Sequence, residues 1–188
     1  MCGRYTLYDV AKSQLNIDID IEPNYNVSPS SEILVINNNM KIEYAYWSLK
    51  PSWSDKINII NARSETLDAK DIFKNAERCI FIANGYYEWK KISSKKVPYY
   101  HTNSNKIMYF GGIIKENRAC IVTRNSYSTI KNIHHRQPVI LGKNTFDMWF
   151  SKKHNYECKK YSEIEIYRVS NSVNNPANNF YENIKKLN

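Results

Sequence analysis

Cys2 carries the most distinctive chemistry in this 188-residue chain. A small residue after Met1 favours removal of the initiator methionine, which leaves cysteine at the N-terminus. An N-terminal cysteine is a 1,2-aminothiol, and its α-amine has a pKa of roughly 7.7–8.0, so a useful fraction is neutral at pH 7. Such an amine attacks an aldehyde to give an imine, and the thiol then closes a thiazolidine ring. Position alone also fits a residue without a special role near a frayed terminus, so the interpretation depends on its neighbours.

Short polar and aromatic motifs accompany Cys2 along the chain, each of them weak by itself. They occupy residues 1–5, 23–29, 47–53, 61–66, 84–89, 98–100 and 133–141. In this order the set closely resembles the SOS-response-associated peptidase (SRAP) family, whose members crosslink to abasic sites in DNA through an N-terminal cysteine. The resemblance runs from residue 2 to about residue 150, with a weaker echo at residues 169–175. It implies a single SRAP-like domain over residues 1–188.

The resemblance implies a role for each of four candidate catalytic residues. Cys2 matches the crosslinking nucleophile, and Asn61 matches the amide that orients the sugar and the terminal amine. Glu88 matches the acid/base residue, and His134 matches the histidine that assists opening of the deoxyribose ring. An abasic sugar is mostly a closed hemiacetal, so its opening requires proton transfers that a histidine titrating near neutrality can perform.

The resemblance also implies a set of DNA-binding residues. Arg4 and Arg63 match ligands of DNA phosphates, and arginine donors fork well onto phosphate oxygens. Trp47 and Trp53 fall in the segment that shapes the DNA-binding groove, although both residues also fit a core. Arg136 fits either a structural or a phosphate-binding role.

For three of the candidate catalytic residues, the sequence alone also allows other interpretations. Glu88 in a strand-like run also fits a solvated face or an ion pair, and Asn61 also fits a turn. His134 and His135 differ by one position, and only the resemblance selects His134.

Composition favours a polyanionic partner and gives no sign of a metal or cofactor. Lys and Arg outnumber Asp and Glu by 27 to 18, a net charge of +9 that is typical of nucleic-acid-binding proteins, although a solvated surface or an AT-rich genome also explains it. The four cysteines lack ligand spacing, which argues against zinc. Cys79 and Cys120 lie in apolar runs and are expected to be buried packing residues.

The elements that must position these residues are mostly strands. Apolar or alternating runs predict strands at residues 32–37, 41–49, 79–83, 86–91, 98–102, 106–113, 119–123, 138–141 and 163–169. Shorter helical patterns occupy residues 8–15, 69–77, 128–133 and 145–150. We therefore expect an α+β fold, built on a strongly bent, mostly antiparallel, barrel-like sheet with short peripheral helices.

Three departures from the family pattern concern groove shape rather than reacting groups. Ser48 replaces a glycine, Gln137 replaces a methionine, and residues 112–114 lack an aromatic side chain often found there.

Together these features predict a monomeric, soluble, cytoplasmic protein with no membrane segment. We expect it to bind single-stranded DNA, or a single-strand/double-strand junction, at an abasic site. It would form a thiazolidine through Cys2 after loss of Met1, and slow reversal of the link would be a lyase-like activity. Two alternatives remain: a cysteine peptidase with Cys2 and His134 as nucleophile and base, and a non-covalent single-stranded DNA-binding module.

Overall fold

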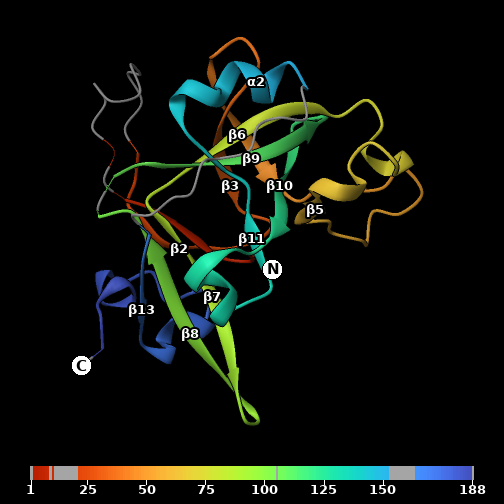
Figure 1. The fold of residues 1–188 in the computed structure, drawn as a ribbon. Helices are drawn as coiled ribbons and strands as arrows, with labels where there is room; N and C mark the ends of the chain where they lie inside the picture. The colour runs from red at the N-terminus through yellow and green to blue at the C-terminus, as the bar shows by residue number, and fades with distance from the viewer. Residues whose placement is uncertain (1, 9, 11–20, 105, 153–163, 188) are drawn as a thin grey trace.

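A ring of five strands forms the centre of the computed structural model, which describes the chain except for residues 1, 9, 11–20, 105, 153–163 and 188 (Figure 1). The ring runs β9–β6–β3–β4–β10 and closes because β10 also pairs with β9. Strands β11, β12 and β5 extend this eight-stranded sheet. Its strands are β3 (Glu32–Ile36), β4 (Ile42–Trp47), β5 (Asn61–Arg63), β6 (Glu77–Ala83), β9 (Met108–Lys115), β10 (Arg118–Asn125), β11 (Arg136–Pro138) and β12 (Ile140–Leu141).

A second sheet of five strands lies beside the ring, in the order β13-β8-β7-β1-β2. Its strands are β1 (Tyr5–Leu7), β2 (Asn24–Val27), β7 (Gly85–Ile92), β8 (Lys95–Thr102) and β13 (Glu165–Arg168). The chain passes between the sheets at Asn84, which separates β6 from β7. Gly85 permits this passage, since a Cβ there would lie 2.4 Å from the Tyr100 ring.

Helical segments are short and peripheral. The α-helix α2 (Phe146–Phe150) packs on β6, and its Trp149 Nε1 donates to the Cys79 carbonyl at 2.9 Å. The 3-10 turns are η1 (Ser64–Thr66), η2 (Asp71–Phe73), η3 (Ser128–Asn132), η4 (Lys143–Thr145), η5 (Asn171–Asn174) and η6 (Tyr181–Ile184). None of the helices in the described part of the chain is long and apolar enough to cross a membrane.

Two apolar clusters hold the sheets together. The larger fills the ring and includes Trp47, Phe81 and Phe110. The smaller consists of Tyr87, Tyr100, Val169, Val173 and Ile184, and it fastens the C-terminal turns η5 and η6 to the second sheet.

The α+β, strongly bent and mostly antiparallel sheet is confirmed, with the pairings of β10 to β4 and to β5 as parallel exceptions among the described strands. The predicted strands are present with shifted ends, and the run at residues 138–141 is divided between β11 and β12. The short strands β1, β2 and β5 were not predicted.

The predicted helices are less accurate. The prediction at residues 145–150 is confirmed by η4 and α2, and residues 128–133 form the 3-10 turn η3. The helix at 69–77 is wrong: only η2 forms there, because Asn75 adopts a left-handed backbone with φ of 64° and β6 begins at Glu77. The helix at 8–15 lies mostly outside the described residues.

Candidate active site

The pairing of β1 with β7 brings the N-terminus of the chain to Glu88. The two strands are antiparallel, with Tyr5 opposite Tyr86, and the Tyr87 amide donates to the Arg4 carbonyl at 3.0 Å. Continuing this register places Gly3, and with it the neighbouring Cys2, alongside Glu88. Two segments more than 80 residues apart in the sequence therefore share one site.

Cys2 is fully buried, with 0% of its surface exposed. Its Sγ lies 3.9 Å from the Arg4 carbonyl oxygen. Burial raises the pKa of the Cys2 thiol, and the nearby Glu88 carboxylate raises it further. The neutral thiol form of Cys2 is therefore favoured.

Asn61 holds the backbone of Cys2 in place. It begins β5, which runs parallel to β10 with Asn61 opposite Ile121. Its Nδ2 donates to the Cys2 carbonyl oxygen at 2.9 Å. Its Oδ1 is buried and has no hydrogen-bond partner within the described part of the chain, so it can accept a hydrogen bond from an amine or a ligand.

Glu88 is suited to proton transfer near neutral pH. The residue is only 2% exposed, and burial raises its pKa from 4.5 to about 7. One carboxylate oxygen, Oε1, lies 3.9 Å from His134 Nδ1. A carboxyl that is half protonated at pH 7 can act both as an acid and as a base.

His134 follows η3 and faces Glu88 across the site. The Arg136 amide lies 3.1 Å from His134 Nδ1, where it donates a hydrogen bond that orients the ring. Burial lowers the pKa of His134, and the neighbouring His135 and Arg136 charges add to this effect. The neutral imidazole is therefore favoured at pH 7. His135 is exposed, and it is His134 that approaches Glu88.

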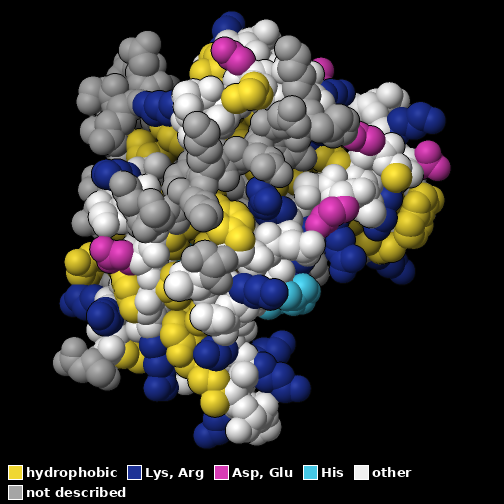
Figure 2. Space-filling model, viewed as in Figure 1, with side chains coloured by type: hydrophobic (Ala, Val, Ile, Leu, Met, Phe, Trp, Pro, Cys, Tyr) yellow, Lys and Arg dark blue, Asp and Glu magenta, His cyan; other side chains and the backbone are white. Residues whose placement is uncertain are grey.

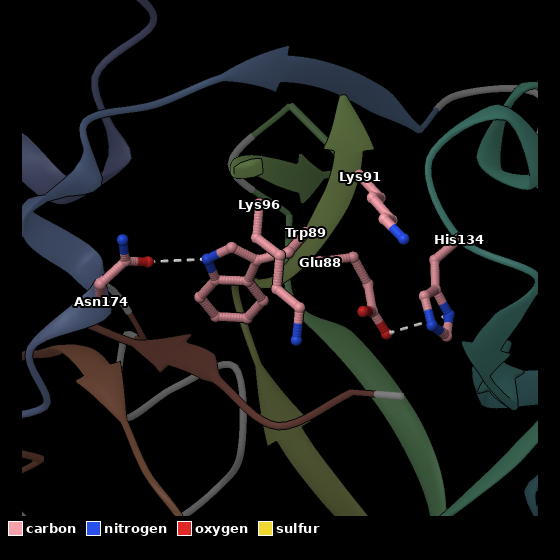
Figure 3. A pocket seen from close by; sticks show the side chains of 6 residues that line it. All are labelled: Glu88, Trp89, Lys91, Lys96, His134 and Asn174. Atoms are coloured by element: carbon pink, nitrogen blue, oxygen red, sulfur yellow. Dashed lines mark hydrogen bonds and ion pairs between the residues drawn. The ribbon is translucent and has the colours of Figure 1, made fainter. Parts of the chain in front are cut away.

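A cavity of about 590 Å³ opens next to these groups. Figure 3 shows Glu88 and His134 pointing toward one another beside Trp89, whose indole Nε1 donates to Asn174 Oδ1 at 2.7 Å. Lys91 and Lys96 complete the lining. In the space-filling view a hollow lies below the histidine side chain, with Lys and Arg side chains around it (Figure 2).

The candidate DNA-binding residues fall into different environments. Arg63 is exposed, and Trp53 is 74% exposed. Arg4 is partly buried, and its guanidinium donates to Asn26 Oδ1 and to the Val173 carbonyl, both at 2.8 Å. Arg4 thus also fastens β1 to β2 and to η5.

Trp47 belongs to the core, not to a surface that could contact DNA. It is 0% exposed, packs against Tyr5 with ring centroids 5.3 Å apart and the rings tilted by 57°, and donates from Nε1 to the Ile60 carbonyl at 3.0 Å. The assignment of Trp47 as a DNA-binding residue is therefore corrected, because its buried side chain cannot reach DNA, and Trp53 is the exposed indole of this segment.

Of its two possible roles, structural and phosphate-binding, Arg136 has the structural one. It is 4% exposed and forms a two-pronged ion pair with Glu65, with N–O distances of 2.6 and 2.9 Å. It also donates to Asn125 Oδ1 and to the Thr123 carbonyl, each at 2.7 Å. This hydrogen bonding from Arg136 lowers the pKa of Glu65 to about 2. Because both terminal nitrogens of its guanidinium donate inside the protein and the residue is buried, Arg136 is not placed to grip a phosphate.

The pocket residues Trp89, Lys91, Lys96 and Asn174 were not among the sequence-based candidates. The run Lys-Lys-Ile-Ser-Ser-Lys-Lys at residues 90–96 is visible in the sequence as a basic hairpin. Asn174 carries no such signal, because it reaches Trp89 only through folding of the C-terminal turns onto the second sheet.

The remaining cysteines give no second reactive centre in the described part of the chain. Cys79 and Cys120 are buried free thiols in the core, as predicted. Cys158 lies outside the described residues. Among the side chains that the structure describes, no group of three or more His, Cys, Asp and Glu residues could hold a metal ion.

Comparisons with known proteins identify the family of this chain. The abasic site processing protein YoaM of Bacillus subtilis is 34% identical, covering 97% of this chain and 96% of that protein. The abasic site processing protein YedK of Escherichia coli is 29% identical, covering 96% of this chain and 90% of that protein. A crystal structure of a Bacteroides thetaiotaomicron protein shares the fold, with a TM-score of 0.81 at 20% identity, over 99% of this chain and 100% of that chain. The family model for SOS response associated peptidase (SRAP) matches residues 1–176, and the chain belongs to this family.

Proposed function

We propose that this protein processes abasic sites in DNA and that Cys2, once Met1 is removed, forms a thiazolidine with the aldehyde of the abasic sugar. The observation that carries the proposal is the meeting of three groups. Asn61 fixes the Cys2 carbonyl at 2.9 Å, Glu88 has a pKa of about 7 through burial, and His134 lies 3.9 Å from Glu88. The names of the Bacillus and Escherichia relatives support the substrate.

The proposed reaction joins one aldehyde to one aminothiol with loss of one water. The Cys2 amine adds to the aldehyde carbon, and protonated Glu88 donates a proton as the carbinolamine hydroxyl leaves as water. The nitrogen keeps its remaining proton, so the product is a protonated imine (iminium), whose carbon then accepts the Cys2 sulfur. Carboxylate Glu88 takes the thiol proton and the nitrogen becomes a secondary amine. The same carboxyl can protonate the departing group on the reverse path, which would give a slow release.

His134 has an earlier role in this scheme. The abasic sugar must first open from its closed hemiacetal, which requires a base for the hydroxyl proton and an acid for the ring oxygen. The lowered pKa of His134 favours the neutral imidazole, which is the form that accepts the proton. Its 22% exposed side chain lies at the edge of the cavity, where a sugar can reach it.

Exposed cationic and aromatic side chains support a single DNA strand, or a strand at a junction, as the partner. Arg63 and Trp53 are exposed and offer a phosphate ligand and a stacking surface. The net charge of +9 adds a favourable field. We expect the protein to act as a monomer, since the reaction needs only groups from one chain.

A cysteine peptidase is less well supported by the same geometry. A peptidase nucleophile is activated as a thiolate by a neighbouring base. Here burial and the Glu88 charge raise the pKa of Cys2, which opposes thiolate formation. A non-covalent DNA-binding module would leave the buried Glu88 and its raised pKa without a role.

A denaturing gel of the protein incubated with abasic single-stranded DNA tests the proposal. We expect a band that survives heating, and intact-mass measurement should show that the reacting protein has lost one methionine. Undamaged DNA of the same sequence serves as the control. Full crosslinking by protein that retains Met1 would contradict the aminothiol chemistry, because Met1 blocks the Cys2 amine.

Arg63 and Arg4 should respond differently to substitution. We expect Arg63→Ala to weaken binding to any single-stranded DNA sequence and to lower the salt slope by about 0.7, without changing stability, because the side chain is exposed. Arg4→Ala should in addition lower the free energy of unfolding by roughly 1–3 kcal/mol, because it removes two hydrogen bonds. Salt-dependent binding and urea unfolding measure the two effects. Base-specific loss of affinity would argue against a phosphate contact.

A further inference from the structure

The hairpin formed by β7 and β8 carries an unusual charge. Four of the seven residues from 90 to 96 are lysines, and none is acidic. In the register of the hairpin, Lys91 lies directly opposite Lys96, and Ile92 lies opposite Lys95. The hairpin projects away from the body of the protein (Figure 1), and Lys and Arg side chains lie on this projection (Figure 2).

This arrangement costs stability unless an anion is bound. Like charges directly opposite one another across a strand pair are destabilising. Lys91, Lys95 and Lys96 are exposed, and no ion pair to Lys90 or to any of these three forms within the described part of the chain. The repulsion between Lys91 and Lys96 is thus offset only by solvent in the free protein.

The two pairs of lysines on the hairpin differ in whether they line the cavity. Lys91 and Lys96 line the cavity that also contains Glu88 and His134, and Figure 3 shows both side chains there. Successive strand residues point to opposite faces, so Lys90 and Lys95 lie on the other face of the hairpin from Lys91 and Lys96. Glu88 shares the face of Lys90 by this alternation, and the cavity, whose lining includes the neighbours Glu88 and Trp89, takes residues from both faces of β7. Lys90 and Lys95 do not line the cavity.

The spacing fits the strand that carries the lesion. A strand rises roughly 3.3 Å per residue, so Lys91 lies about 10 Å along β7 from Glu88. A lysine side chain extends several ångströms farther. Its ammonium can therefore reach a phosphate within one or two nucleotides of a sugar bound at Glu88.

We propose that Lys91 and Lys96 bind the phosphodiester backbone on one side of the abasic site and so fix the direction in which the DNA strand leaves the cavity. This inference rests on the proposed function, because it takes the sugar to lie at Cys2 and Glu88. A phosphate between the two ammonium groups removes their repulsion. Lysine serves as a point-charge ligand that tolerates any base sequence.

A pair of double variants tests this assignment with the same change of charge. Lys91→Gln with Lys96→Gln, the cavity-face variant, removes the charges of the two lysines that line the cavity. Lys90→Gln with Lys95→Gln, the opposite-face variant, removes the charges of the two lysines on the other face of the hairpin. Both are made in a Cys2→Ala background, and binding is measured on single-stranded DNA containing a tetrahydrofuran abasic analogue, which has no aldehyde. This readout depends on DNA contacts alone and not on crosslinking.

We expect the cavity-face variant to bind about tenfold more weakly, the product of two exposed contacts each worth roughly a factor of three. Its salt slope should fall by about 1.4, since each contact to single-stranded DNA contributes roughly 0.7. The opposite-face variant should bind nearly as well as its parent. Equal losses in the two variants would show a general effect of charge, and no loss in either would also overturn the assignment.

The side of the lesion provides a second readout. Oligonucleotides that extend from the analogue in only one direction should lose the lysine-dependent affinity in one of the two orientations. Equal lysine dependence in both orientations would overturn the directional role. If the wild-type protein fails to crosslink an authentic abasic site, the proposed function fails, whereas this binding comparison still reports whether the lysines contact the backbone.

Discussion

Cys2→Ala is expected to abolish the heat-stable product with abasic DNA while non-covalent binding stays close to that of the wild type. The amine of the new N-terminal alanine can still form an imine, but without the sulfur no thiazolidine closes, and the imine hydrolyses on heating. Denaturing gels with and without borohydride separate the two species. We expect Cys2→Ala to give a band only after reduction.

Cys120→Ala is the matched control, because it removes a fully buried thiol from the same core without touching the site. It should crosslink at the wild-type rate. Cys2→Ser should give a weaker link, since its amine still forms an imine and a hydroxyl closes the ring less readily. A heat-stable band from Cys2→Ala equal to that of the wild type would move the chemistry to a lysine.

Glu88→Gln is expected to slow thiazolidine formation by at least ~10²-fold, the usual contribution of a positioned acid or base. The amide keeps the shape of the side chain but cannot exchange a proton. The wild-type rate should rise with pH as the Cys2 amine deprotonates, with a pKa of roughly 7.7–8.0. It should fall again as Glu88, with its pKa of about 7, loses its proton. In Glu88→Gln, the crosslinking rate should still rise with pH but should no longer fall at higher pH. An unchanged bell-shaped profile would remove Glu88 from the mechanism.

The same substitution should change how stability depends on pH. Because the pKa of Glu88 is raised in the folded protein, the unfolded chain loses its proton first as pH rises through 4.5 toward about 7. Folding is therefore penalised increasingly over this range, by roughly 3 kcal/mol once both states are ionised. Urea unfolding should show Glu88→Gln gaining stability relative to the wild type between pH 5 and 8. If the difference in the free energy of unfolding between the two proteins stayed constant over this pH range, the pKa of Glu88 would not be raised by burial in the folded protein.

His134→Ala is the companion variant, since it tests the other proton-transfer step. It should slow crosslinking to the closed abasic sugar by ~10²-fold, and the rate should recover with a substrate that is already an open aldehyde. Glu88→Gln should not recover with that substrate. Release into excess competitor DNA should also be slowed in Glu88→Gln. Equal rescue of both variants would show that the two roles are not divided in this way.

The long strands of both sheets were predictable because their residues follow local rules. The stretches that became β6, β9 and β10 are rich in Ile, Val and Phe, and their burial shows that both faces are covered. The helix expected at residues 69–77 failed because a periodic pattern does not show that Asn75 takes up a left-handed conformation. Short strands such as β1 and β5 form through pairing with distant partners, so three residues alone carry no period.

The sequence by itself predicted the candidate reacting residues, because the reactivity of an aminothiol, a carboxyl and an imidazole belongs to the residue type and its motif. It also predicted the α+β class through strand-length apolar runs. Only the tertiary structure decided which candidates meet: the β1–β7 pairing brings Cys2 to Glu88, and β5 brings Asn61 to the Cys2 carbonyl. Burial likewise decided that Trp47 and Arg136 are structural and that Glu88 titrates near pH 7. Desolvation depends on every neighbour that excludes water, and those neighbours come from distant parts of the chain.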